Sequence, residues 1–280
     1  MAMTWPVLMA VLFGALLHAS WNALVKSSQD KTLDTALIHV LCSLLALPIC
    51  LYVGPPPDQS WPFILCSLVV HVGYYFALAG AYKHGDLGLT YPLMRGTAPM
   101  LVALASLALL DESLSSMAWL GVAAISAGVL LLGLSQGWWA HRKAVWFALS
   151  NAVLIAIYTV IDAKGARSSG HVLQYVAMLF ALDGWPFALL VFMQRKGRVW
   201  PYVQSRWPMA MGGAAASLGS YSIALWAMTV APVAMVAALR ETSVFFAALI
   251  GAWLLHERWT RQRVLGTVAI LSGVAALRLG

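Results

Sequence analysis

The sequence has little charge for its length. Only 10% of its 280 residues are Asp, Glu, Lys or Arg, whereas 61% are hydrophobic. A water-soluble domain carries about 25% charged residues, so this composition excludes an ordinary soluble globule. It indicates a chain whose solvent is mostly lipid.

Motifs for covalent or hydrolytic chemistry are also missing. The chain has no phosphate-binding loop, no HExxH and no GxSxG pattern, so we do not expect an enzyme or a cofactor. Cys42, Cys50 and Cys66 stand in apolar sequence without CxxC spacing and predict neither a metal site nor a disulfide. The net charge is +7, but no run of Lys or Arg favours nucleic acid as a partner.

Long apolar segments fill the chain instead. A helix needs about 20 mainly apolar residues to cross a bilayer. Residues 207–239 carry no charge and are too long for one span, so we expect a break near Pro232, which disfavours helical geometry at the residue before it. We predict an all-α integral membrane protein with ten transmembrane helices, near residues 5–25, 34–53, 62–82, 88–110, 117–135, 144–163, 172–193, 207–229, 232–255 and 262–279.

The sequence repeats itself at a constant shift of 145 residues, because residues 94–128 match residues 239–273 without a gap. The matched pairs include Arg95 with Arg240, Glu112 with Glu257, Gly121 with Gly266, and Gly128 with Gly273. We predict two halves of five spans each, residues 1–137 and 138–280. Since five is odd, the second half enters the membrane from the opposite side, which makes a five-plus-five inverted repeat around a central cavity.

Small residues recur on one face of the fifth and tenth expected spans. They are Gly121, Ala124 and Gly128, with Gly266, Ala269 and Gly273 as their repeats. Small residues let helix backbones approach closely, so we expect these two helices to pack together and assign them no chemistry.

Basic residues are distributed unevenly between the two sides of the membrane. With ten spans, the side of the termini carries only Lys164, Arg167 and Arg278, and the other side carries most of the remaining Lys and Arg. Basic loops favour the cytoplasm. We therefore expect both termini on the non-cytoplasmic side of a cell inner membrane.

The chain resembles the EamA-type branch of the drug/metabolite transporter superfamily. The resemblance rests on the repeated series Arg95–Glu112–Gly128 and Arg240–Glu257–Gly273, in which an apolar helix closes on an acidic residue (LLDES, LLHER) before a Gly-rich span. It implies a ten-helix bundle with a central cavity that moves small organic solutes. The sequence departs from the family at the two arginines, where mostly apolar or acidic residues are expected.

Arg95 and Arg240 lie inside expected spans, where a charged residue costs about 2.5 to 3.5 kcal/mol unless it faces a wet cavity or a partner. One hypothesis is that both bind an anionic solute group, because a guanidinium keeps its charge and offers two parallel donors. The alternative is structural: each arginine neutralises an acidic neighbour, for example Glu241.

Glu241 follows Arg240 directly, and adjacent residues of a helix point about 100° apart, so we do not expect the two to face one spot. Glu241 is a candidate for proton coupling or for binding a substrate ammonium, and a helix–helix contact is the alternative. His18 and Asn22 are four residues apart on one helix face and should line the cavity. Further candidate contacts, with core packing as the alternative for each, are Tyr74, Tyr158, Tyr221 and Trp226.

These features predict a secondary active transporter that works by alternating access. The expected substrate is a small anionic or zwitterionic metabolite, such as an amino acid, an organic acid or a phosphonate. Its partners are this solute, the lipid bilayer and, as a hypothesis, protons, and it acts as a monomer or a homodimer. The alternatives are an exporter of hydrophobic or cationic compounds and a non-transporting membrane enzyme or structural protein.

Overall fold

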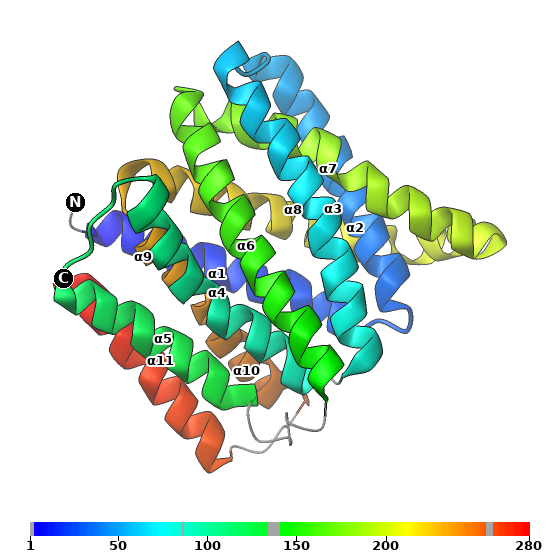
Figure 1. Ribbon diagram of the computed structural model, residues 1–280. Helices are drawn as coiled ribbons and strands as arrows, with labels where there is room; N and C mark the ends of the chain where they lie inside the picture. Colours follow the sequence, from blue (N-terminus) through cyan, green and yellow to red (C-terminus); the bar gives the residue numbers. More distant parts are fainter. Residues whose placement is uncertain (1–2, 86, 134–140, 256–259) are drawn as a thin grey trace.

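The computed structural model describes residues 3–85, 87–133, 141–255 and 260–280, and the described part of the chain contains helices and no strands (Figure 1). The α-helices are α1 (Trp5–Lys26), α2 (Lys31–Val53), α3 (Trp61–His84), α4 (Leu87–Leu109), α5 (Ser116–Gly133), α6 (Arg142–Ser168), α7 (Val172–Arg195), α8 (Val199–Val230), α9 (Val233–Arg240), α10 (Thr242–Leu255) and α11 (Arg261–Leu279). Short 3₁₀ turns, η1 (Asp58–Ser60) and η3 (Lys196–Arg198), precede α3 and α8.

The apolar runs form membrane-length helices, which confirms an all-α membrane protein. Eight segments of the described chain are long and apolar enough to cross a bilayer, and α5 contributes a shorter apolar helix. One of the eight, Val172–Val230, contains both α7 and α8. The exact number of ten membrane crossings stays a prediction.

The break near Pro232 forms where the sequence places it. Helix α8 ends at Val230, Ala231 is extended, and α9 begins at Val233. A second break was not predicted: the expected span 232–255 is interrupted at Glu241. There the backbone N–H of Glu241 donates to Ala238 O at 3.0 Å, a three-residue step that tightens the chain and separates α9 from α10.

Helices α5 and α11 lie side by side, as the small residues predict (Figure 1). A Cβ built on Gly121 would lie 2.9 Å from Gly273 O, and one built on Gly128 would lie 2.7 Å from Gly266 O. The order of contacts is reversed along the two helices, so they run antiparallel. The repeat shift relates α5 to α11. These two repeat-related helices therefore run in opposite directions, as an inverted repeat requires.

Other contacts obey the same exchange. Helix α2 packs on its repeat α7, and the packing of α3 on α6 has its counterpart in the packing of α1 on α8. The predicted boundary between residues 137 and 138 and the signature residue Glu257 lie outside the described residues.

Seven residues of α9 belong to the largest buried hydrophobic cluster. Residues 233–239 are all buried, and a helix that is apolar all round belongs inside a bundle. The end of α9 therefore delivers Arg240 and Glu241 to the interior of the protein.

Candidate functional site

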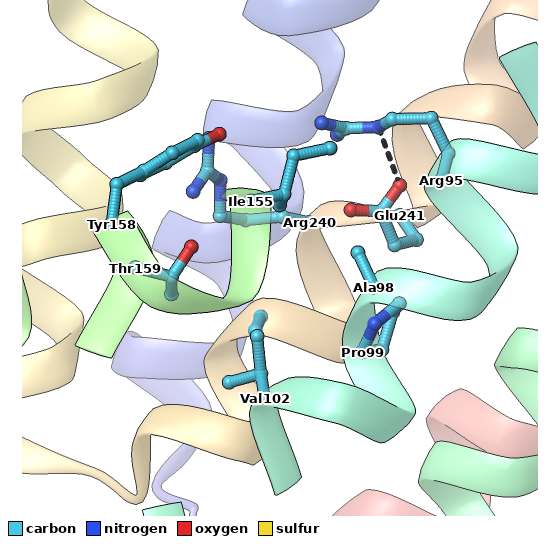
Figure 2. Close-up of a pocket in the computed structure, with 10 residues that line it drawn as sticks. Arg95, Ala98, Pro99, Val102, Ile155, Tyr158, Thr159, Arg240 and Glu241 are labelled. Carbon is cyan, nitrogen blue, oxygen red and sulfur yellow. Dashed lines mark ion pairs between the residues drawn. The ribbon is translucent and has the colours of Figure 1, made fainter. Parts of the chain in front are cut away.

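A pocket lies between α4, α6 and α9 (Figure 2). Its volume is about 10 Å³, which is near the room that one water molecule needs. The residues that line it are Arg95, Ala98, Pro99, Val102, Ile155, Tyr158, Thr159, Ala237, Arg240 and Glu241. Half of these residues are apolar, and the polar and charged ones converge on the pocket from α4, α6 and the end of α9.

Both arginines of the repeat border this one pocket. Arg95 reaches it from α4, between Pro92 and Pro99, and Arg240 reaches it from the end of α9. The residues that the shift of 145 relates are therefore brought together, one from each half.

Arg95 and Glu241 form an ion pair in the pocket wall (Figure 2). Arg95 Nε lies 2.7 Å from Glu241 Oε2, and the two residues are only 8% and 4% exposed. Removing one partner of such a buried pair leaves an uncompensated charge and costs about 3–5 kcal/mol. Arg95 thus has the acidic partner that the structural alternative proposed, Glu241, and the pair lies at the wall of the pocket.

Arg240 has a different environment. Its guanidinium carbon lies 5.1 Å from the centre of the Tyr221 ring, a cation–π contact, and no ion pair to Arg240 occurs within the described part of the chain. The Tyr221 hydroxyl donates in turn to Asp162 Oδ2, and the Tyr175 hydroxyl donates to Asp162 Oδ1 at 2.9 Å. The face of the Tyr221 ring therefore contacts Arg240, and the hydroxyls of Tyr221 and Tyr175 donate to the buried Asp162.

Arg240 and Glu241 border the same pocket although they are adjacent, which corrects the expectation that they do not face one spot. They do contact different partners, Tyr221 on α8 and Arg95 on α4. Both side chains are long, and α9 ends at Arg240. The two side chains can therefore leave the backbone in different directions and still reach the same pocket.

The other predicted contacts lie close to this pocket in part. Tyr158 lines it and stacks on His71, with ring centres 4.5 Å apart, and Tyr74 contacts the Tyr158 ring edge-on. His18 on α1 is not among the residues that line the pocket, and its Nδ1 accepts from the ring N–H of Trp21 at 3.3 Å. Asn22 instead donates to the backbone oxygen of His18 at 2.7 Å, so its amide is engaged within its own helix.

Comparison with known proteins identifies the family of the chain. Residues 4–134 and residues 142–279 each match the EamA-like transporter family. The chain belongs to the EamA-like transporter family. It is a multi-pass membrane protein, and the two family matches cover residues 4–134 and 142–279 separately.

Two individual proteins are similar to this EamA-like transporter. One is described as "Uncharacterized transporter in cobO 3'region" from Sinorhizobium sp, with 38% identity over 76 residues, 27% of this chain and 53% of that protein. The match thus spans about half the length of that relative. The other is a solved structure described as "Crystal structure of protein", with a TM-score of 0.75 and 19% identity over 98% of this chain and 95% of that one, which shows a shared fold.

Trp226 of the transporter is not brought to the pocket between α4, α6 and α9. It is 41% exposed and lines a separate groove with residues of α7 and with His171 and Ser222. Sequence periodicity alone did not distinguish this outward face of α8 from the face that carries Tyr221.

An ion pair that the sequence did not predict joins the two halves near the termini. Arg167 Nη2 lies 2.5 Å from Glu112 Oε1, and Glu112 Oε2 accepts from the backbone N–H of Val233 at 2.8 Å. Arg167 also donates to the backbone oxygens of Met228 and Ala231, at 2.8 Å and 3.3 Å. Glu112 thereby satisfies the first N–H of α9, and Arg167 satisfies the end of α8.

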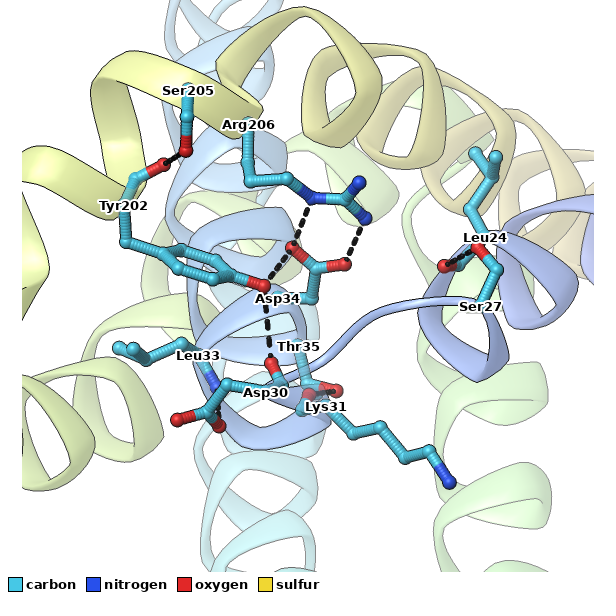
Figure 3. A network of polar contacts seen from close by, with 10 residues as sticks. All are labelled: Leu24, Ser27, Asp30, Lys31, Leu33, Asp34, Thr35, Tyr202, Ser205 and Arg206. Carbon is cyan, nitrogen blue, oxygen red and sulfur yellow. Dashed lines mark hydrogen bonds and ion pairs between the residues drawn. The ribbon is translucent and has the colours of Figure 1, made fainter.

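A second network joins the halves at the other end of the bundle (Figure 3). Arg206 on α8 binds Asp34 on α2 through two nitrogens, at 3.3 Å and 2.7 Å, and the Tyr202 hydroxyl donates to Asp34 at 2.8 Å. Successive spans run in alternate directions, so the start of α2 and the end of α4 are on opposite sides of the membrane. Charged contacts thus join the two halves at both ends of the bundle.

Proposed function

We propose that this transporter is a secondary carrier of a small anionic or zwitterionic metabolite, such as an amino acid, an organic acid or a phosphonate, and that Arg95 and Arg240 bind its anionic group. The observation that carries the proposal is that both repeat-related arginines border one buried pocket. The pocket wall holds two guanidinium groups and one carboxylate, so its formal charge favours an anion.

Alternating access between the halves, residues 1–137 and 138–280, is the proposed mechanism. A pocket of about 10 Å³ is too small for a metabolite, so the helices around it must separate before a solute enters. The ion pairs Glu112–Arg167 and Asp34–Arg206 join the halves on opposite sides. Breaking one while the other holds would open the pocket to one side at a time.

The remaining features of the proposal follow the sequence. The protein would lie in a cell inner membrane with both termini non-cytoplasmic, would act as a monomer or a homodimer, and would couple transport to a gradient for which protons, through Glu241, are the candidate.

Solute flux into proteoliposomes tests this function. The panel should include an amino acid, lactate, methylphosphonate and the lipophilic cation tetraphenylphosphonium, and the variants should be Arg95→Gln and Arg240→Gln. Exposed Arg198 offers a matched control, Arg198→Gln, because it carries the same charge away from the pocket. We expect anion or zwitterion flux that both pocket variants lose and the control retains.

Wild-type flux in both pocket variants would contradict the proposal. Flux of the lipophilic cation alone would favour the exporter of hydrophobic or cationic compounds. An absence of flux from folded protein for every solute would count against transport of this substrate class.

A further inference from the structure

Resting on the proposed function, we infer that Glu241 is a built-in carboxylate that occupies Arg95 in the empty transporter, and that the carboxylate of a monoanionic substrate displaces it. Arg95 and Glu241 come from opposite halves, and their contact forms part of the pocket wall rather than a contact elsewhere between helices. A ligand that reaches Arg95 must therefore meet Glu241.

The hydrogen bonding of this pair is incomplete. Arg95 Nε and Nη2 and Glu241 Oε2 are buried without an aligned hydrogen-bond partner, although Nε and Oε2 are 2.7 Å apart. The carboxylate thus contacts the guanidinium by its charge and not through the two parallel N–H···O bonds that make arginine–carboxylate pairs strong. A free carboxylate is not attached to a backbone, so it can adopt the two-bond arrangement that Glu241 does not make.

The Asp34–Arg206 pair shows by comparison what a complete pairing looks like in this chain. There two arginine nitrogens donate to the two carboxylate oxygens and a tyrosine hydroxyl adds a third donor. That network joins helices at the end of the bundle. The less complete pair is the one in the pocket, where a contact that must exchange with substrate is needed.

The backbone at Glu241 permits such an exchange. Glu241 stands between the end of α9 and the start of α10, with three-residue hydrogen bonds on both sides, from its own N–H to Ala238 O and from Val244 N to its oxygen, each at 3.0 Å. Its side chain can rotate away from Arg95 while these backbone bonds stay in place. It then remains next to Arg240, its neighbour in sequence.

Charge balance identifies the class of substrate. With Glu241 ionised, the pocket has two positive groups and one negative group, so one further negative charge makes it neutral. A buried site requires its charges to be paired, so a monoanion fits better than a dianion or a zwitterion. The same count predicts that removing the charge of Glu241 shifts the preference toward a dianion.

Two probes of similar size and different charge test both parts of the inference: propionate and malonate. Their binding is measured on purified full-length protein by the rise in melting temperature, because a ligand of the folded state stabilises it. The variants are Glu241→Gln, which keeps the shape and removes the charge, and Glu241→Asp, which keeps the charge and shortens the side chain by one methylene.

We expect the wild-type protein to bind propionate more tightly than malonate. Glu241→Gln should bind propionate at least about tenfold more tightly than wild type, because the competing carboxylate is gone. It should gain still more affinity for malonate. Glu241→Asp should bind propionate with an intermediate affinity, and it serves as the test if the glutamine variant does not fold.

Unchanged or weaker propionate binding in Glu241→Gln would overturn the inference, as would failure of all three proteins to bind propionate. A failure of the inference about Glu241 can be distinguished from a failure of the proposed function by the flux of the arginine variants. If Arg95→Gln and Arg240→Gln still lose solute flux, the arginines bind substrate and only the role of Glu241 is wrong. If both arginine variants transport normally, the proposed function itself fails.

Discussion

Replacing Gly128 with alanine should force α5 and α11 apart. A Cβ at Gly128 would lie 2.7 Å from Gly266 O and 2.9 Å from Ile270 N, both of which are backbone atoms that cannot rotate away. Atoms in contact prefer separations of about 3.5–4.0 Å, so the helices would have to move by about 1 Å. Overpacking of this kind costs about 1–3 kcal/mol.

The repeat makes this prediction sharper. Gly273 is the counterpart of Gly128, and a Cβ there would lie 2.7 Å from Gly121 O and 2.9 Å from Ile125 N. Gly273→Ala should therefore destabilise the protein by about the same amount as Gly128→Ala. Gly212 on α8 is the matched control, because a Cβ there meets no atom within 4 Å.

Melting temperature of the detergent-purified protein measures these effects. At about 2–4 °C per kcal/mol for a protein of this size, each seam variant should melt about 2–12 °C lower. Gly212→Ala should be neutral or slightly stabilising, since alanine is the better helix former. Unchanged melting of both seam variants, or a large difference between them, would refute the packing and its symmetry.

Substitutions of Tyr221, Glu112 and Trp226 test the surroundings of the pocket. Tyr221→Phe keeps the ring beneath Arg240 and should hold substrate affinity within about twofold. Tyr221→Leu should weaken substrate affinity about 2- to 30-fold, because it removes a cation–π contact worth about 0.5–2 kcal/mol. Equal affinities of the two variants would contradict that contact. Glu112→Gln breaks the ion pair with Arg167 on the side of the termini. It should speed the labelling of a Thr159→Cys reporter in the pocket by a membrane-impermeant thiol reagent added from that side. Unchanged labelling would count against a role of this ion pair in closing the pocket. Trp226→Ala should leave uptake unchanged because Trp226 lies outside the pocket, and loss of uptake by folded protein would reverse that assignment.

The spans were predictable because membrane-length apolar runs and Pro232 are local signals. The break at Glu241 was not, because it involves neither proline nor glycine and arises where the backbone takes a three-residue step. The convergence of Arg95 and Arg240 followed from the repeat shift, which carries information about symmetry that hydropathy lacks.

The ion-pair partners required the packing of distant helices. Asp34 and Arg206 are 172 residues apart and have no spacing that relates them. Glu112 was visible as a repeated acidic residue, but its bond to the first N–H of α9 depends on α4 ending beside the start of that helix. For Trp226 and Tyr221, five residues apart on α8, residue type alone suggested the same role, and only the packing of α8 separates the inward residue from the outward one.

The most direct test of the anion site is an experimental structure of the transporter with its transported solute bound. We predict that the anionic group of the solute lies within hydrogen-bonding distance of both Arg95 and Arg240, and that Glu241 is turned away from Arg95. A solute bound elsewhere, with the Arg95–Glu241 ion pair intact beside an empty pocket, would contradict it.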